Sequence, residues 1–234
     1  MKGNRRALIA AILFTWVMVA ASWWAWSTGK GPVAMWLRMG VSVGLILTGV
    51  AAGGLRSPYG RAILFGLFCG WWGDFFLSPD GPASFMAGLV AFLIGHVAYC
   101  GAFIIRRSRP YLAAAAFLAM LVPGGLLAWW LWPHFPAGLR VPAVVYGLAL
   151  SAMVALAVGT VPLPGGWLAA VGAVIFYVSD IGVAHMNFVG ASRVIALGTV
   201  VLYILGQILL ASSIAACGAK AEPASPDMGP LART

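Results

Sequence analysis

Acidic residues are nearly absent from this sequence, which contains five Asp and Glu residues among 234. Charged residues of both signs make up 8% of the chain, whereas a typical soluble domain has about 25%. Hydrophobic residues make up 62%, which is more apolar surface than a soluble fold can bury. The composition therefore excludes an ordinary soluble domain and predicts an integral membrane protein.

Cysteine is also scarce, and the basic residues form no cluster. The three cysteines lie in apolar segments without metal-type spacing, which excludes a disulfide framework and indicates small buried side chains. The net charge of +9 comes from Lys and Arg residues near the ends of apolar runs, where membrane topology requires them. We therefore expect membrane lipids and no nucleic acid as partners, and nothing in the sequence specifies an oligomeric state.

Long apolar runs separated by short turn-rich segments are the main feature that is present. Each run has about 17–24 residues, the length of a helix that crosses a ~30 Å hydrocarbon core. The sequence thus predicts an all-α polytopic membrane protein, with eight helices in one domain over residues 1–217. A tail rich in Pro, Ala and Ser follows over 218–234, and we expect it to be disordered and cytoplasmic. The eight predicted spans are 7–26, 33–52, 62–78, 85–105, 111–132, 141–160, 167–185 and 194–217.

The distribution of Lys and Arg predicts the orientation, because basic residues accumulate on the cytoplasmic side of a membrane. With a cytoplasmic N-terminus, the outer side carries only Lys30, Arg140 and Arg193. We therefore predict a protein of the bacterial inner membrane with both termini in the cytoplasm. The inner side then carries Lys2, Arg5, Arg6, Arg56, Arg61, Arg106, Arg107, Arg109, Lys220 and Arg233.

Two of the five acids, Asp74 and Asp180, lie inside predicted spans, where an ionisable group is costly and by default functional. Both spans run outward, and each aspartate lies ~18–20 Å along its helix at 1.5 Å per residue. Each follows a small residue and has an aromatic residue three positions earlier. This similarity favours two related four-helix halves, and the matched depth predicts that the carboxyls face each other across one polar cavity lined by the third, fourth, seventh and eighth helices.

Further polar side chains fall on neighbouring spans and are candidates for the same site. His96 and Tyr99 share a face of the fourth span, and Tyr203 and Gln207 form an i, i+4 pair on the eighth. Each candidate also has a purely structural interpretation, such as a hydrogen bond between helices or a side chain that reaches the headgroups. The candidates for proton transfer are Asp74, Asp180 and His96, and those for substrate binding are Arg38, Tyr99, Tyr177, Tyr203 and Gln207.

Four short motifs in this order carry a resemblance to a known family. The chain resembles the YhhN-like lysoplasmalogenase family of membrane proteins over most of its length, from Arg38 to Ser213. Where that family tends to have Lys-Pro, this chain has Arg38-Met39, which keeps the positive charge and loses the proline. The motifs are Gly-Asp at 73–74, Gly-His-x-x-Tyr at 95–99, Ser-Asp at 179–180, and Tyr203 with Gln207.

The resemblance implies hydrolysis of the vinyl ether of lysoplasmalogens, and we expect no metal or cofactor to be needed. A vinyl ether is cleaved after protonation of its β-carbon, which produces an oxocarbenium ion that water then attacks. Two carboxyls can supply the acid, the base and the negative charge, as in glycosidases. His96 and Tyr99 would orient a carboxyl or carry its proton, and Arg38 would bind the phosphate of a lysophospholipid. The chemistry leaves open which aspartate is the acid.

Two alternatives belong to other classes. Asp74, Asp180 and His96 could instead hold a metal ion in a membrane lipid hydrolase. The protein could also be a proton-coupled carrier or lipid-binding protein without enzymatic activity. A Ser179 nucleophile is disfavoured, because Ser179 adjoins Asp180 and neighbouring helical residues point about 100° apart.

Overall fold

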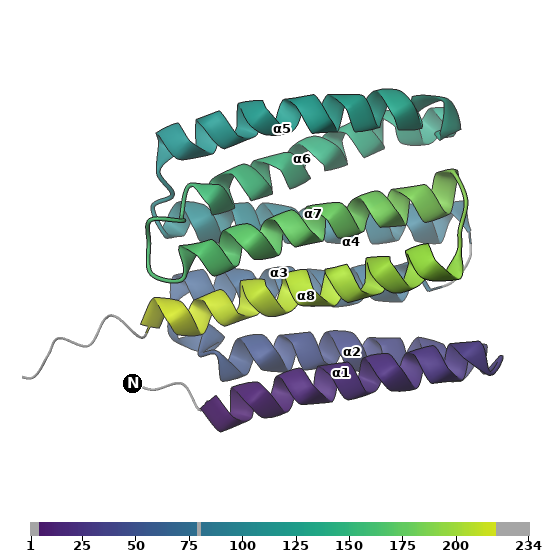
Figure 1. The fold of residues 1–234 in the computed structure, drawn as a ribbon, viewed down its shortest axis with the longest axis horizontal. Helices are drawn as coiled ribbons and strands as arrows, with labels where there is room; N and C mark the ends of the chain where they lie inside the picture. Colours follow the sequence, from purple (N-terminus) through teal and green to yellow (C-terminus); the bar gives the residue numbers. More distant parts are fainter. Residues whose placement is uncertain (1–4, 79–80, 219–234) are drawn as a thin grey trace, which may run out of the picture.

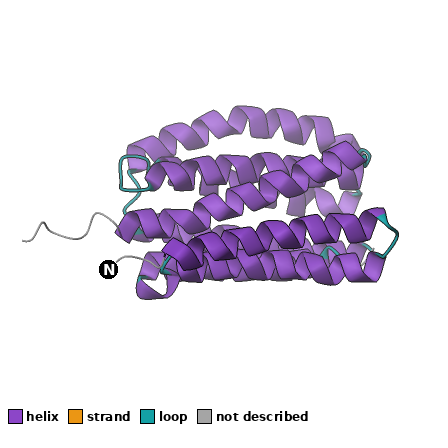
Figure 2. Cartoon of the chain, turned by 60° about the horizontal axis from the view of Figure 1, so that its bottom comes forward, coloured by secondary structure: helices purple, strands orange, loops and turns teal. Residues whose placement is uncertain are grey.

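Eight long helices run through residues 5–78 and 81–218, which are the residues that the computed structural model describes (Figure 1). Three short 3₁₀ helices lie in the connections: η1 (Gly54–Arg56), η2 (Trp132–His134) and η3 (Ala137–Leu139). Helices and short loops account for all of this part of the chain (Figure 2), which confirms the all-α prediction. The predicted tail lies outside the described residues from 219 onward. The long helices are α1 (Arg5–Ser27), α2 (Gly31–Ala51), α3 (Pro58–Phe76), α4 (Pro82–Ile105), α5 (Pro110–Leu131), α6 (Arg140–Val158), α7 (Gly166–Phe188) and α8 (Arg193–Gly218).

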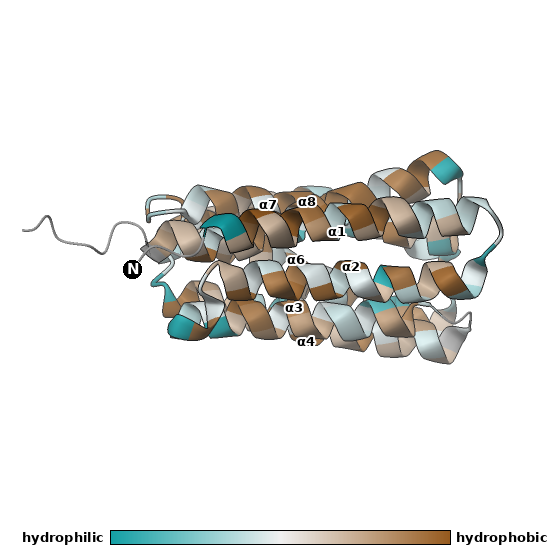
Figure 3. Cartoon of the chain, turned by 90° about the horizontal axis from the view of Figure 1, so that it is seen from below, coloured by the Kyte–Doolittle hydropathy of each residue, from teal (hydrophilic) through white to brown (hydrophobic). Residues whose placement is uncertain are grey.

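Seven of these helices are long and apolar enough to cross a membrane, and α3 is the exception within the described residues. Helix α3 has 19 residues but contains Arg61, Asp74 and several glycines. Its glycines serve packing: Gly66 lies directly under the Tyr99 ring of α4, and Gly73 lies under Phe92. The glycines that lower its hydropathy are therefore those that let α3 pack closely against α4. Figure 3, in which the backbone is coloured by hydropathy, shows hydrophobic residues along the helices and most hydrophilic segments toward their ends.

Where a proline and a capping residue precede an apolar run, the observed helix begins earlier than the run. The third span was predicted from residue 62, whereas α3 begins at Pro58. Ser57 is its N-cap and accepts a hydrogen bond from the Gly60 amide at 3.0 Å. Proline is favoured in the first turn of a helix, because its missing N–H would have no partner there. A pattern of hydropathy alone does not detect these polar first turns.

Helices that follow one another in the chain pack as antiparallel pairs, α1 with α2, α3 with α4, α5 with α6, and α7 with α8. Helices α7 and α8 lie in front of α3 and α4 in Figure 1, with α1 and α5 at opposite edges. Further contacts join α2 to α3 and α8, and α4 to α6. The relation between two four-helix halves stays a prediction.

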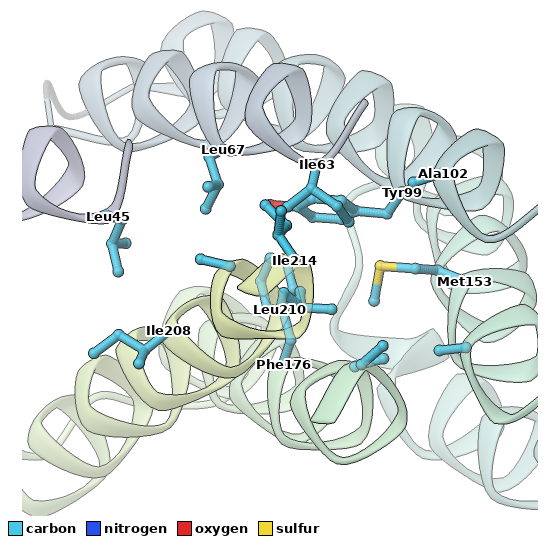
Figure 4. Close-up of a cluster of buried hydrophobic side chains, with 14 of the residues drawn as sticks. Leu45, Ile63, Leu67, Tyr99, Ala102, Met153, Phe176, Ile208, Leu210 and Ile214 are labelled. Atoms are coloured by element: carbon cyan, nitrogen blue, oxygen red, sulfur yellow. The ribbon is translucent and has the colours of Figure 1, made fainter. Parts of the chain in front are cut away.

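A buried apolar cluster joins most of these helices (Figure 4). Its fully buried members come from α2, α3, α4, α6, α7 and α8, so they tie the inner helices together. Its large side chains include Leu45, Ile63, Tyr99, Met153, Phe176 and Leu210.

Helices α7 and α8 cross at two glycines, and this crossing predicts the effect of a single methyl group. A Cβ atom on Gly172 would lie 2.8 Å from the Gly206 carbonyl, and one on Gly206 would lie 2.9 Å from the Gly172 carbonyl. Because these obstacles are backbone atoms, we expect Gly206→Ala to force the helices apart and destabilise the protein by about 1–3 kcal/mol. Thermal unfolding in detergent should show a lower Tm.

The control is Gly198→Ala on the same helix, where a Cβ would meet no atom within 4 Å. It gains the same helix propensity without the clash, so its Tm should match or exceed that of the wild type. Equal Tm values for Gly206→Ala and Gly198→Ala would contradict the close crossing.

Candidate functional site in an interhelical cavity

A partly enclosed cavity of about 790 Å³ lies between the helices and carries both Asp74 and Asp180 on its wall. All eight long helices contribute lining residues, so α1, α2, α5 and α6 line the cavity in addition to the predicted α3, α4, α7 and α8. The cavity extends from the aspartates to Trp23 and Trp26 of α1 and to Trp132 and Phe135 beyond α5. It reaches the end of the bundle that the sequence predicts to be the outer one, and there the ends of the outlying helices help to enclose it.

Asp74 is held by hydroxyl groups from two other helices. Ser42 of α2 donates a hydrogen bond to Asp74 Oδ2 at 2.5 Å, and Tyr203 of α8 donates to the same oxygen at 2.9 Å. Ser42 is buried, and both Tyr203 and Asp74 line the cavity. The carboxyl group of Asp74 is therefore fixed in position while it still faces the cavity.

Arg38 lies beside Asp74 but binds its backbone. Its Nη2 donates to the Asp74 carbonyl oxygen at 2.9 Å and also to Ser78 Oγ. Ser78 Oγ in turn donates to the same carbonyl at 2.7 Å. Arg38 lines the cavity, and its buried Nε has no hydrogen-bond partner. The guanidinium group therefore keeps an unused donor. Helix α2 runs without interruption through Arg38-Met39, the position where the family's proline is missing.

Asp180 meets a residue that the sequence did not single out, Tyr146 of α6. The Tyr146 hydroxyl donates to Asp180 Oδ2 at 2.5 Å, and it lies 2.9 Å from His96 Nε2. His96 Nε2 is itself 3.5 Å from Asp180 Oδ2. Tyr146 lines the cavity. A search for every tyrosine inside a predicted span would have found it, but only its contacts distinguish it from an ordinary packing residue.

His96 is fully buried and is not part of the cavity wall. Its ring packs against Tyr146 and Phe176, with centroid distances of 5.0 and 5.1 Å. Its Nδ1 is buried without a hydrogen-bond partner. His96 therefore reaches the cavity through Tyr146 and Asp180, which makes direct contact with a bound molecule unfavourable in this arrangement.

Tyr99 and Gln207 also lie behind the cavity wall. The Tyr99 hydroxyl donates to Gln207 Oε1 at 2.7 Å, and both residues are buried. Neither lines the cavity, so the geometry does not place them against a substrate as the sequence interpretation expected. A Cβ atom added to Gly70 would lie 3.5 Å from Gln207 Nε2 and 3.2 Å from the Tyr203 hydroxyl, so these two groups lie near each other. The pair thus supports Tyr203, which holds Asp74.

Of the other candidates, Tyr177 does line the cavity, with its hydroxyl close to Gly124 of α5. Ser179 donates to the Thr199 carbonyl at 3.0 Å, an interhelical contact rather than that of an activated nucleophile. His185 stacks on Trp130 at 5.9 Å. In residues 5–78 and 81–218, no three His, Cys, Asp or Glu side chains gather as metal ligands, so the ligand set of the metal alternative does not form.

The fold and the cavity define a class of protein: a polytopic helical membrane protein with two carboxyl groups, Asp74 and Asp180, on the wall of one internal cavity. The YhhN family matches residues 33–214, and the chain belongs to this family.

Curated relatives agree with this assignment. A lysoplasmalogenase of Mycobacterium bovis is 34% identical over 169 residues, which cover 69% of this chain and 64% of the relative. The lysoplasmalogenase TMEM86B of Sus scrofa is 31% identical over 176 residues, 74% of this chain and 71% of the relative. The matched region thus spans a little under two thirds of the mycobacterial protein. No solved structure matches the chain significantly.

Proposed function

We propose that this protein hydrolyses the vinyl ether bond of lysoplasmalogens to a fatty aldehyde and a glycerophospho-base. The observation that carries the proposal is the pair of carboxyl groups on one cavity wall inside an apolar bundle. The names of the relatives support the choice of substrate. A lysophospholipid in the bilayer is then the partner, and a bacterial inner membrane with cytoplasmic termini is the proposed location.

The reaction needs one water molecule and no change of oxidation state overall. A proton is added to the β-carbon of the vinyl ether, and the α-carbon and oxygen become an oxocarbenium ion. Water adds to the α-carbon and loses a proton, which gives a hemiacetal. The hemiacetal hydroxyl then loses its proton while the glycerol oxygen gains one, and the C–O bond breaks.

The different surroundings of the two aspartates suggest different roles. Asp180 is linked to Tyr146 and His96, and histidine is the side chain that most readily exchanges a proton near neutral pH. We assign proton donation to the Asp180 side of the cavity. Asp74 accepts hydroxyl hydrogen bonds beside the Arg38 guanidinium. We assign Asp74 to the activation of water and to the stabilisation of the oxocarbenium ion, because both tasks require a negative charge.

The test is to supply purified protein in nanodiscs with a lysoplasmalogen, its saturated ether analogue and an ester lysophospholipid. Aldehyde should appear from the vinyl ether alone, because the saturated ether has no carbon that can be protonated. Release of fatty acid from the ester at a similar rate would overturn the proposal in favour of an esterase.

Two further measurements in the same preparation separate the alternatives. Activity that is lost with a chelator and restored by zinc would replace the carboxylate mechanism with a metal-dependent one. Proton-coupled lipid flux in vesicles without any aldehyde would identify a carrier.

Arg38 predicts a separate effect on substrate binding. Its guanidinium group and its position on the cavity wall suit a phosphate group. Arg38→Ala should raise KM about 10-fold and leave kcat within a few-fold, because the headgroup is bound equally in the ground and transition states. Steady-state kinetics would check this, with Arg140→Ala at the start of α6 as a control. A fall in kcat with an unchanged KM would show that Arg38 acts in the chemical step.

A further inference from the structure

The cavity has an apolar arm between α5 and α6, which the proposed chemistry does not use. We define the apolar arm by the lining residues of α5 and the adjacent face of α6. The α5 residues that line it all have apolar side chains or none: Met120, Leu121, Gly124, Gly125, Leu127, Ala128 and Leu131. The α6 face adds apolar residues around Tyr146, among them Val144, Gly147 and Leu150.

Two glycines leave this arm open. A Cβ atom added to Gly125 or to Gly147 would meet no other atom within 4 Å, and both residues line the cavity. Gly124 differs, because a Cβ there would lie 3.4 Å from the Tyr177 hydroxyl. Gly125, which is exposed, and Gly147 therefore face open space, and a larger side chain at either position would extend along the arm without displacing protein atoms at its first carbon.

The apolar arm begins beside the proton-transfer groups. Gly147 directly follows Tyr146, whose hydroxyl donates to Asp180. On the Asp74 side, the cavity contains the Arg38 guanidinium and Ser78 among apolar residues of α1 and α2. The wall therefore presents a cationic group, then the two carboxyls, then an apolar arm. A single-chain amphiphile whose reactive bond lies between its phosphate and its chain matches this order.

Helix α5 is also the least enclosed wall of the cavity. Ala113 and Leu131 are its buried residues, and its main packing partner is α6. Pro123 lies inside α5, where proline cannot donate the backbone hydrogen bond of a regular helix. Displacement of α5 therefore sacrifices little packing, and this side of the bundle is the favourable one for entry of a chain from the bilayer.

We propose that the apolar arm binds the alk-1-enyl chain of the substrate, and that Gly125 and Gly147 determine which chain lengths are accepted. The assignment rests on the proposed function, since it is the vinyl ether next to the carboxyls that places the chain in this arm. Removal of each methylene from water favours binding only while the arm has room for it.

The experiment compares Gly125→Leu and Gly147→Leu with the wild type on lysoplasmalogens of short, medium and long chain. The control is Gly101→Leu on α4, where a Cβ also meets no atom within 4 Å but the residue does not line the cavity. We expect the ratio of kcat/KM for long over short chains to fall at least ~10-fold in the two arm variants. The control should keep the wild-type ratio.

The alanine variants at the same positions should shift the kcat/KM ratio less, and they replace a leucine variant that does not fold. Unchanged ratios in folded arm variants would overturn the inference, and so would an equal loss for all chain lengths. If the wild type releases no aldehyde, the proposed function fails by itself. Binding of saturated ether lysophospholipids of several lengths then tests the arm: a loss confined to long chains in the arm variants supports it, and unchanged binding overturns it.

Discussion

Asp74→Asn and Asp180→Asn are each expected to lower kcat by ~10²–10⁴, the range that proton transfer by a positioned side chain contributes. Asparagine has the shape of aspartate and can still accept through its carbonyl oxygen the bond from Tyr146, or those from Ser42 and Tyr203. It can neither release a proton as an acid nor take one as a base. The variants should therefore fold and bind lipid while turnover is lost.

The measurement is aldehyde release at saturating lysoplasmalogen, together with Tm in detergent to verify folding. Asp80→Asn is the matched control, since Asp80 falls between two of the apolar runs of the sequence, and its kcat should equal that of the wild type. A well-folded variant of Asp74 or Asp180 that retains kcat within a few-fold would leave that aspartate a structural role only.

Tyr146→Phe should have the second largest effect, a fall in kcat of about 10²-fold with KM changed by no more than a few-fold. Phenylalanine keeps the ring that packs on His96 at 5.0 Å but lacks the hydroxyl that joins His96 to Asp180. His96 is buried behind the cavity wall, so the loss of this hydroxyl leaves it only the 3.5 Å approach of its Nε2 to Asp180 Oδ2. A residue that served only packing would not change kcat in this variant.

A double-mutant cycle with His96→Ala tests the connection itself. If Tyr146 and His96 act as one unit, the double variant should be about as slow as the slower single variant, since such effects are strongly non-additive. The control is Tyr111→Phe, which removes the hydroxyl of an exposed tyrosine at the start of α5. Multiplicative losses for Tyr146 and His96 would show that they contribute independently.

The sequence by itself determined the class of protein, the helices and the two acids. Long apolar runs are sufficient for this, because each backbone group in a membrane must find its partner within the helix. The same reasoning makes Asp74 and Asp180 conspicuous, since an acid within such a run is costly. The first residues of the helices were predicted less accurately: α3 begins at Pro58, in a polar first turn that a hydropathy pattern does not detect.

The surroundings of the two acids were decided only by the tertiary structure. A 3.6-residue period shows which residues share a face of one helix, but it does not show how that helix is rotated against its neighbours. Close crossings such as Gly172 with Gly206 set this rotation. The packing of α6 against α7 brings Tyr146 to Asp180, and Gln207 lies behind Tyr203. The polar residues could thus be found one helix at a time, whereas their partners depend on contacts between helices far apart in the chain.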